Sequence, residues 1–248
     1  MNAATLNLTL GDAQRRFFYR KGTVDEVIIA RVLQDSVFNF GRLRHAADLS
    51  RLYRRLVRTG KAPLIVDSKA NFGASAVYFA CSFAKARVIA IEPERSNFDL
   101  LAVNAEGLRV ECMRAAVAAS AADLGGAMLG AEFPGIQSIS SGGGINRVPS
   151  VPAVTINEIY EKNEQDTLPF IVKVDIEANG AALFAANTEW IGRTPVIVVV
   201  LHDGLIPGTA NSRAFVERIA NFNRDFVYLH DNVFSIDRDL IAGDFDDP

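Results

Sequence analysis

Hydrophobic residues follow two alternating patterns from residue 63 onward. Short unbroken apolar runs are typical of strands buried on both faces of a parallel sheet, whereas apolar residues at three- and four-residue spacing indicate amphipathic helices. Their alternation predicts parallel β-α-β units. The expected strands span 64–66, 88–91, 110–114, 170–176 and 196–201, with a short strand entering a helix over 154–160. The expected helices span 73–84, 96–105, 181–186 and 212–222.

The end of the chain breaks this alternation. Two short apolar runs, 227–229 and 233–236, flank the polar residues 230–232, and this pattern predicts a β-hairpin. We therefore expect an α/β fold whose mostly parallel, seven-stranded sheet ends in an antiparallel pair.

The first 62 residues show helical spacing over 12–19, 24–38 and 43–59, with glycines between these segments. We expect a helical cap or extension over 1–62, covering one sheet edge or roofing a crevice, followed by the main domain over 63–248. Several aromatic residues of this region form either a substrate lid or part of the core: Phe17, Phe18, Tyr19, Phe38 and Phe40.

Residues 115–149 have little hydrophobic pattern and many small residues. Such a stretch inside a compact domain is either a mobile loop over a site or a disordered insertion. The sequence leaves these alternatives open, and with them the order of residues 125–150.

Composition limits the classes of partner. With 248 residues, 49% of them hydrophobic, the chain fits one domain with an appended cap better than two domains. A net charge of −3 gives no sign of a nucleic-acid or membrane surface, although the first 60 residues are rich in arginine. Those arginines form either a solvated helix face or a site for an anionic partner.

The two cysteines, Cys81 and Cys112, lie in apolar surroundings without metal-ligand spacing, which indicates buried thiols in a reducing compartment. No basic segment followed by a long apolar run opens the chain, and no later run is long enough to span a membrane. We expect a cytoplasmic protein without a metal site, and the oligomeric state stays open, a homo-oligomer included.

Acidic residues follow several of the expected strands. Asp67 ends the first strand and Glu92 the second, about 20 residues beyond the turn at Gly73, where dinucleotide-binding folds place a ribose acceptor. In an open α/β sheet these tips face the ligand crevice, and Asp67 could hold an ammonium or hydroxyl group there. The plainer alternatives are a capped helix start at Asp67 and a solvated turn at Glu92.

Two later strands end in the same way. Asp175 and Glu177 lie at the tip of the strand over 170–176, and His202 follows the strand over 196–201. Parallel strands present their carboxyl ends at one edge, so these side chains are expected to converge on one cleft that binds a nucleotide-like cofactor.

The motifs between residues 63 and 236 resemble the FkbM-type family of S-adenosylmethionine-dependent methyltransferases. The family turn D-x-G-A-N-x-G is matched at Asp67, Ala70, Asn71 and Gly73. The family segment E-P-x-x-x-N-F-x-x-L-x-x-N is matched at Glu92, Pro93, Asn97, Phe98, Leu101 and Asn104. Two further segments, 155–159 and 173–177, are similar to the family's T-L-D-E-L and K-I-D-V-E-G-A-E.

The resemblance implies a Rossmann-like class I methyltransferase fold and methyl transfer from S-adenosylmethionine to a hydroxyl group of a small molecule or saccharide. It assigns Asp67, Asn71 and Gly73 to the methionine end of the cofactor, and Glu92 to the ribose. It further assigns Asp175 and Glu177 to the neighbourhood of the methyl group, and His202 to the role of base or acceptor orienter. Arg114 and Ala115 are assigned to the adenine, and the remaining cofactor positions are Ala70, Pro93 and Asn97.

The sequence also departs from the family pattern. Lys69 replaces the first glycine of the turn, and its positive charge is unfavourable near a sulfonium unless it points away or pairs with Asp67 or Asp175. The other departures are Ala178, Asn179 and Gly180 in place of G-A-E, and Val200 in place of an acid. The alternative is a non-catalytic relative that acts as a binding or scaffold module.

Other enzyme classes fit less well. The first turn lacks the G-x-G-x-x-G spacing of nicotinamide dehydrogenases, and an acid at that strand tip would repel a pyrophosphate. The chain has no G-x-S-x-G motif, and its three histidines have no ligand spacing with the cysteines.

Overall fold

A seven-stranded sheet with the order β10-β11-β9-β8-β3-β4-β5 forms the centre of the protein in a computed structural model. The structure describes residues 3–10, 13–120, 151–176, 183–201, 208, 210 and 212–243. The strands are β3 (Ala62–Ser68), β4 (Arg87–Ile91), β5 (Val110–Met113), β8 (Thr167–Ile176), β9 (Val196–Leu201), β10 (Arg224–Leu229) and β11 (Asn232–Asp237).

Strand direction confirms the expected plan. β5, β4, β3, β8 and β9 run parallel, and β11 is antiparallel to both β9 and β10. Counted from the β5 edge, the order is β5-β4-β3-β8-β9-β11-β10. β3, β4 and β5 thus build one half of the sheet outward from the centre, and β8 and β9 extend the other half. The closing hairpin places its second strand, β11, beside β9. This is the Rossmann-like class I methyltransferase fold that the motifs imply.

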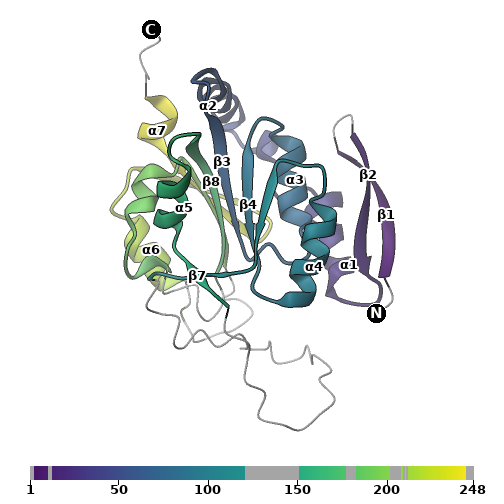
Figure 1. Cartoon of the computed structure of the whole chain (residues 1–248). Helices are drawn as coiled ribbons and strands as arrows, with labels where there is room; N and C mark the ends of the chain where they lie inside the picture. Colours follow the sequence, from purple (N-terminus) through teal and green to yellow (C-terminus); the bar gives the residue numbers. More distant parts are fainter. Residues whose placement is uncertain are drawn as a thin grey trace.

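Two layers of helices cover the two faces of the sheet (Figure 1). Alternate residues of β3 show why: Ile65 joins one hydrophobic cluster, while Leu64 and Val66 join the other. The first cluster also contains side chains of α2 (Ala46–Arg58), α3 (Ala74–Ser82) and α4 (Arg95–Asn104). The second contains side chains of α5 (Ile156–Asn163), the 3-10 helix η5 (Glu189–Arg193) and α6 (Arg213–Ile219).

Small elements complete the fold. β6 (Ala116–Val117) pairs in parallel with β7 (Ala153–Val154), so the expected short strand before α5 is present. A short helix, α7 (Arg238–Ala242), follows the hairpin. Of the helix expected over 181–186, residues 183 and 184 form a 3-10 turn, and 181 and 182 lie outside the described residues. The loop expected over 125–150 lies wholly outside them.

The prediction of a helix over 12–19 is wrong. β1 (Ala3–Leu10) and β2 (Ala13–Arg20) form an antiparallel hairpin, in which Thr5 is paired with Phe18. Aromatic side chains favour strands, and the inward-facing Phe17 is 1% exposed and packs edge-on against Phe72. Tertiary packing therefore overrides the apparent helical spacing.

The rest of the N-terminal region is helical. α1 (Val24–Ile29) continues into a π-helical turn, η1 (Ala30–Gln34), and ends earlier than the expected 24–38; α2 agrees with the expected 43–59. Phe17, Phe38 and Phe40 are buried, which favours core packing over a lid. They share the first cluster with α3, and the division at residue 62 stays a prediction.

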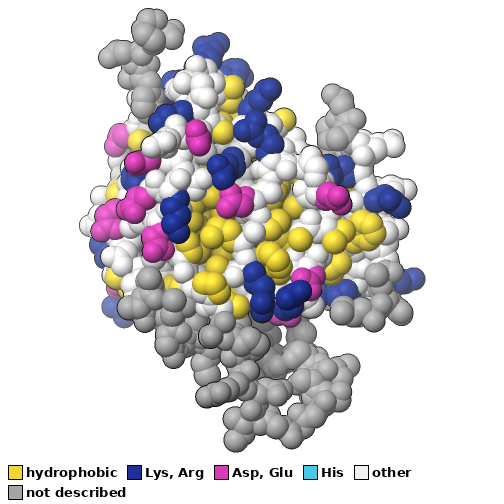
Figure 2. Space-filling model, viewed as in Figure 1, with side chains coloured by type: hydrophobic (Ala, Val, Ile, Leu, Met, Phe, Trp, Pro, Cys, Tyr) yellow, Lys and Arg dark blue, Asp and Glu magenta, His cyan; other side chains and the backbone are white. Residues whose placement is uncertain are grey.

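The surface mixes both signs of charge. On the face in Figure 2, Lys and Arg side chains are interspersed with Asp and Glu, and hydrophobic side chains lie between them. Cys81 and Cys112 are half-buried rather than fully buried, and burial raises the pKa of both thiols. Within the described ranges, no helix is long and apolar enough to cross a membrane.

Candidate cofactor site

The carboxyl ends of β3, β4 and β8 bring the predicted acids to one edge of the sheet. Asp67 is paired in register with Ala90 of β4 on one side and with Lys173 of β8 on the other. Glu92 directly follows β4, and Asp175 lies two residues beyond Lys173 on β8. The structure therefore places Asp67, Glu92 and Asp175 at the same end of neighbouring strands.

The carboxylate of Asp67 is already paired within the protein. Its Oδ1 lies 3.0 Å from Nζ of Lys173, and Ser75 Oγ donates a 2.6 Å hydrogen bond to Oδ2. The two charged side chains are 0% and 7% exposed. The lysine that pairs with Asp67 is thus Lys173, and Asp67 is not open to hold a ligand ammonium directly.

Lys173 also fixes the turn that follows β3. Its Nζ donates to the carbonyl oxygens of Ser68 and Lys69, both at 3.2 Å. Burial, the largest single influence, lowers the pKa of Lys173, but the combined attraction of Asp67, Asp175 and Glu92 outweighs it and raises the pKa above its ordinary value. The side chain is therefore a buried cation, and a lysine inside an apolar strand was the sequence signal for it.

The turn between β3 and α3 uses left-handed backbone at Lys69, Asn71 and Gly73, with φ of 59°, 53° and 98°. A Cβ at Gly73 would lie 2.9 Å from Cδ1 of Leu101, so this glycine permits the close approach of α4. Lys69 adopts the left-handed conformation that glycine adopts at low cost, at a strain of about 1–2 kcal/mol. The replacement of glycine by Lys69 therefore does not abolish the turn.

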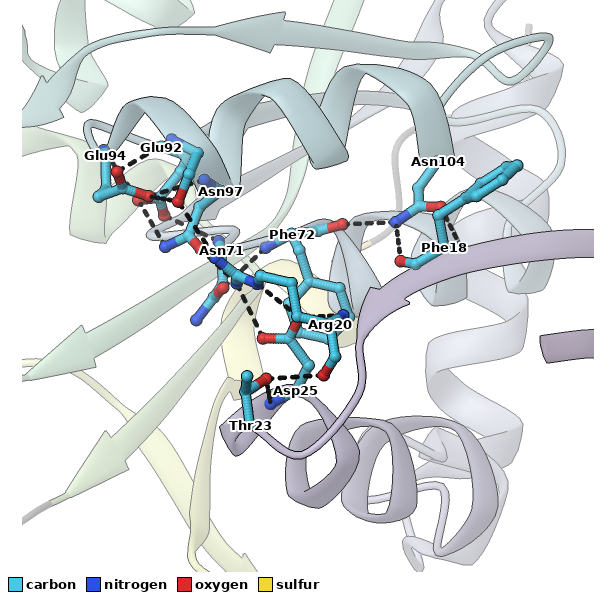
Figure 3. A network of polar contacts seen from close by, with 11 residues as sticks. Phe18, Arg20, Thr23, Asp25, Asn71, Phe72, Glu92, Glu94, Asn97 and Asn104 are labelled. Atoms are coloured by element: carbon cyan, nitrogen blue, oxygen red, sulfur yellow. Dashed lines mark hydrogen bonds and ion pairs between the residues drawn. The ribbon is translucent and has the colours of Figure 1, made fainter. Parts of the chain in front are cut away.

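Glu92 is the centre of a polar network (Figure 3). Its Oε2 accepts from the backbone N–H of Asn71 at 2.8 Å, and its Oε1 accepts from the N–H of Glu94 at 3.0 Å and from Asn97 Nδ2 at 3.4 Å. The residue is 2% exposed, and burial raises its pKa despite these hydrogen bonds and the nearby charge of Lys69. A carboxylate has about four acceptor positions, so one remains for a ligand hydroxyl.

The other predicted cofactor residues surround this network. The N–H groups of Glu92 and Ala115 both donate to the carbonyl oxygen of Met113 at 3.1 Å, which places the tip of β5 beside Glu92. Ala115 and Ala70 are buried, and Pro93 and Arg114 are half-buried.

The acceptor side is only partly described. Asp175 is half-buried and is paired in register with Val200 of β9. The predicted base His202 and the predicted acid Glu177 lie outside the described residues, as do the departures at Ala178, Asn179 and Gly180. Their roles stay predictions. The sequence analysis did not identify Lys173 as a site residue, nor Arg20, which donates to Asn97.

Comparisons with known proteins find distant similarity to solved structures. No protein-family model matches the chain, and no curated protein matches it. A precorrin-6y C5,15-methyltransferase from Geobacter metallireducens is 14% identical, over 76% of this chain and 85% of that one, with a TM-score of 0.38. A methyltransferase from Geobacter sulfurreducens is 16% identical, over 88% and 90%, with a TM-score of 0.39.

A SAM-dependent O-methyltransferase from Thermotoga maritima is 12% identical, over 92% of this chain and 70% of that one, with a TM-score of 0.35. All three similar structures are methyltransferases by name. Because the identities and TM-scores are low, the fold assignment rests on the strand order of the chain itself.

Proposed function

We propose that the protein is an S-adenosylmethionine-dependent methyltransferase that methylates a hydroxyl group of a small molecule or saccharide. One observation carries this proposal: the carboxylate of Glu92 follows β4 and contacts the turn after β3, within a sheet of class I methyltransferase order. That position suits a ribose acceptor. Membership of the FkbM family and a cytoplasmic location are part of the same proposal, supported by the sequence.

The chain's residues divide between the parts of the cofactor. Glu92 accepts from a ribose hydroxyl, and Asn71 and Asn97 hold its carboxylate. Ala70, Gly73 and Pro93 shape the wall of the site, and the tip of β5 at Arg114 and Ala115 borders the adenine. Asp67 supports the methionine end indirectly, through Lys173 and the carbonyl groups that Lys173 holds.

The acid that faces the sulfonium is Asp175 rather than Asp67. The side chain of Asp67 is 0% exposed, whereas Asp175 is half-buried at the end of β8, and both carboxylates attract the buried Lys173. The cofactor supplies a methyl group already activated by the positive sulfur. The protein's part is to align the acceptor oxygen and exclude water, with Glu177 near the acceptor and His202 taking the hydroxyl proton.

A second candidate function has support in the same geometry. Glu92 is 2% exposed and Asp67 is fully buried in an internal ion pair, so two of the acids are committed to internal contacts. This arrangement favours a non-catalytic relative that keeps the fold as a binding or scaffold module.

Calorimetry with S-adenosylmethionine and S-adenosylhomocysteine separates the two candidates. The methyltransferase hypothesis predicts that each chain binds one molecule of either ligand with micromolar affinity and that Glu92→Gln abolishes this binding. Glu111→Gln is the matched control, because Glu111 is exposed on the neighbouring strand and pairs with Arg87. Absence of binding by the wild-type protein would favour the scaffold module.

A further inference from the structure

The side chain of Arg20 connects the N-terminal hairpin to the candidate cofactor site. Arg20 ends β2, and its guanidinium contacts Asp25 at the start of α1 and two residues at the start of α4 (Figure 3). These contacts join segments more than 70 residues apart, since Arg20 and Asn97 are separated by 77 positions. Arg20 and Asp25 lie outside the motifs from which the family resemblance was drawn, whereas Asn97 belongs to one of them.

Asp25 fixes the guanidinium of Arg20 in one orientation. Nε and Nη2 of Arg20 donate to the two carboxylate oxygens of Asp25, both at 2.8 Å, and the backbone N–H of Arg20 adds a third hydrogen bond at 2.9 Å. The Asp25 side chain is 0% exposed and that of Arg20 is 18% exposed. A bidentate pair of this kind is geometrically specific, so the remaining donors of Arg20 point in defined directions.

Those remaining donors are used on α4. Nη2 donates to Asn97 Oδ1 at 2.6 Å, and Nη1 donates to Ser96 Oγ at 3.1 Å. The amide of Asn97 accepts on one side and donates on the other, and its Nδ2 faces Glu92 Oε1 at 3.4 Å. Holding the oxygen of this amide therefore also fixes the donor that faces Glu92.

A second contact ties the hairpin to the same turn. Asn104 Oδ1 accepts from the N–H of Phe18 at 2.7 Å, and its Nδ2 donates to the carbonyl oxygens of Phe18 and Phe72, both at 2.9 Å. Phe72 directly follows Asn71, whose N–H donates to Glu92. The hairpin is thus connected to the side-chain amide of Asn97 and, through Phe72, to the backbone N–H of Asn71, and both of these groups donate to Glu92.

We propose that Arg20, held by Asp25, is a positioning residue of the cofactor site that orients the carboxylate of Glu92 through Asn97. The N-terminal hairpin is then part of this site rather than a separate appendage. The proposal rests on the proposed function, in which Glu92 accepts from a ribose hydroxyl. The alternative is that Arg20 only attaches the hairpin to α4. The two hypotheses predict different ligand affinities for variants of Arg20.

The test compares Arg20→Gln with Arg15→Gln. Arg15 lies on the same strand and donates to the carbonyl oxygen of Glu106, beyond the other end of α4, so its loss also loosens the hairpin. The dissociation constants of S-adenosylhomocysteine and its 2′-deoxy analogue are measured for each protein. We expect Arg20→Gln to weaken binding of the natural ligand about tenfold, because the hydrogen bond between the ligand and the charged Glu92 carboxylate is weakened.

The deoxy analogue makes the test specific for the ribose contact. Arg20→Gln should change its dissociation constant by less than about threefold, because a hydrogen bond to Glu92 is already missing. Arg15→Gln should leave the dissociation constants of both ligands within about twofold of the wild-type values, because surface substitutions far from a site usually have small effects. Arg20→Lys keeps the charge beside Asp25 but loses the planar fork, so it should recover part of the affinity; it also replaces Arg20→Gln should that variant fail to fold.

Amide hydrogen exchange in the ligand-free protein gives an independent measurement. Exchange at Asn71 and Glu94, whose N–H groups donate to Glu92, should accelerate in Arg20→Gln and stay unchanged in Arg15→Gln. Equal ligand affinities and equal exchange in the two variants would overturn the positioning role and leave the proposed function standing. If the wild-type protein binds neither ligand, the proposed function fails, while the exchange rates still decide whether Arg20 orients Glu92.

Discussion

Replacement of Lys173 by methionine is expected to destabilise the protein strongly. The variant keeps the volume of the side chain but removes the cation beside the carboxylate of Asp67, which is 0% exposed and still accepts from Ser75 Oγ. Removing one member of a buried ion pair costs about 3–5 kcal/mol, because an uncompensated charge stays in the interior. At about 2–4 °C per kcal/mol for a chain of this size, the melting temperature should fall by roughly 6–20 °C.

A double-mutant cycle isolates the interaction between the two side chains. Lys173→Met, Asp67→Asn and the double variant are unfolded in urea, with free energies taken by linear extrapolation. The double variant removes both charges, so it should be more stable than the sum of the single losses predicts, by about 1–3 kcal/mol. The same cycle on the exposed pair Arg87 and Glu111 is the control, with an expected coupling of about 0–1 kcal/mol.

The result that would refute this reasoning is additivity. If Lys173→Met and Asp67→Asn sum to the loss of the double variant, with no more coupling than the exposed control pair, the two side chains do not stabilise each other. The ion pair would then not fix the turn after β3.

Three further predictions concern single residues. Burial raises the pKa of Glu92, so its contribution to stability is fully present below the unfolded value of about 4.3 and is lost as the pH rises through the folded pKa. The unfolding free energy of wild type minus that of Glu92→Gln should therefore fall over that window in urea titrations, and a difference independent of pH would contradict it. Lys69→Gly should change the free energy of unfolding by less than about 1 kcal/mol, because relief of left-handed strain offsets the added entropy of the unfolded chain. The same variant should bind S-adenosylmethionine several-fold more tightly in calorimetry, because a positive charge near the sulfonium is removed. Unchanged affinity would refute this repulsion. Thr155→Ala removes the hydroxyl that caps α5 and should cost about 1 kcal/mol in urea unfolding, and no loss would show that the capping box does not stabilise α5.

The hydrophobic pattern determined most of the sheet. β3, β4 and β9 lie between other strands, and helices cover both faces of the sheet, so their side chains are buried on both sides and a continuous apolar run fits. The polar residues at 230–232 likewise marked the reversal between β10 and β11. These features depend on neighbours along the chain, and the sequence contains that information directly.

The N-terminal hairpin could not be predicted in this way. The segment around Phe17 has apolar and charged residues that fit either a helix or a strand, and its own spacing favours the helix. Pairing with residues 3–10 and the contact of Phe17 with Phe72 decide the outcome. The strand pairing depends on residues of β1, and the aromatic contact depends on Phe72, which is distant in the sequence.

The sequence by itself determined which side chains end the strands: Asp67, Glu92 and Asp175. Only the tertiary structure decided what each carboxylate contacts. Asp67 pairs with Lys173 because β8 lies beside β3 in the sheet, although 106 positions separate them, and Glu92 is reached from Arg20 because the hairpin packs on α4. The physical reason is that strand tips follow from local hydrophobicity, whereas charge pairing in a buried site depends on which strands and helices become neighbours.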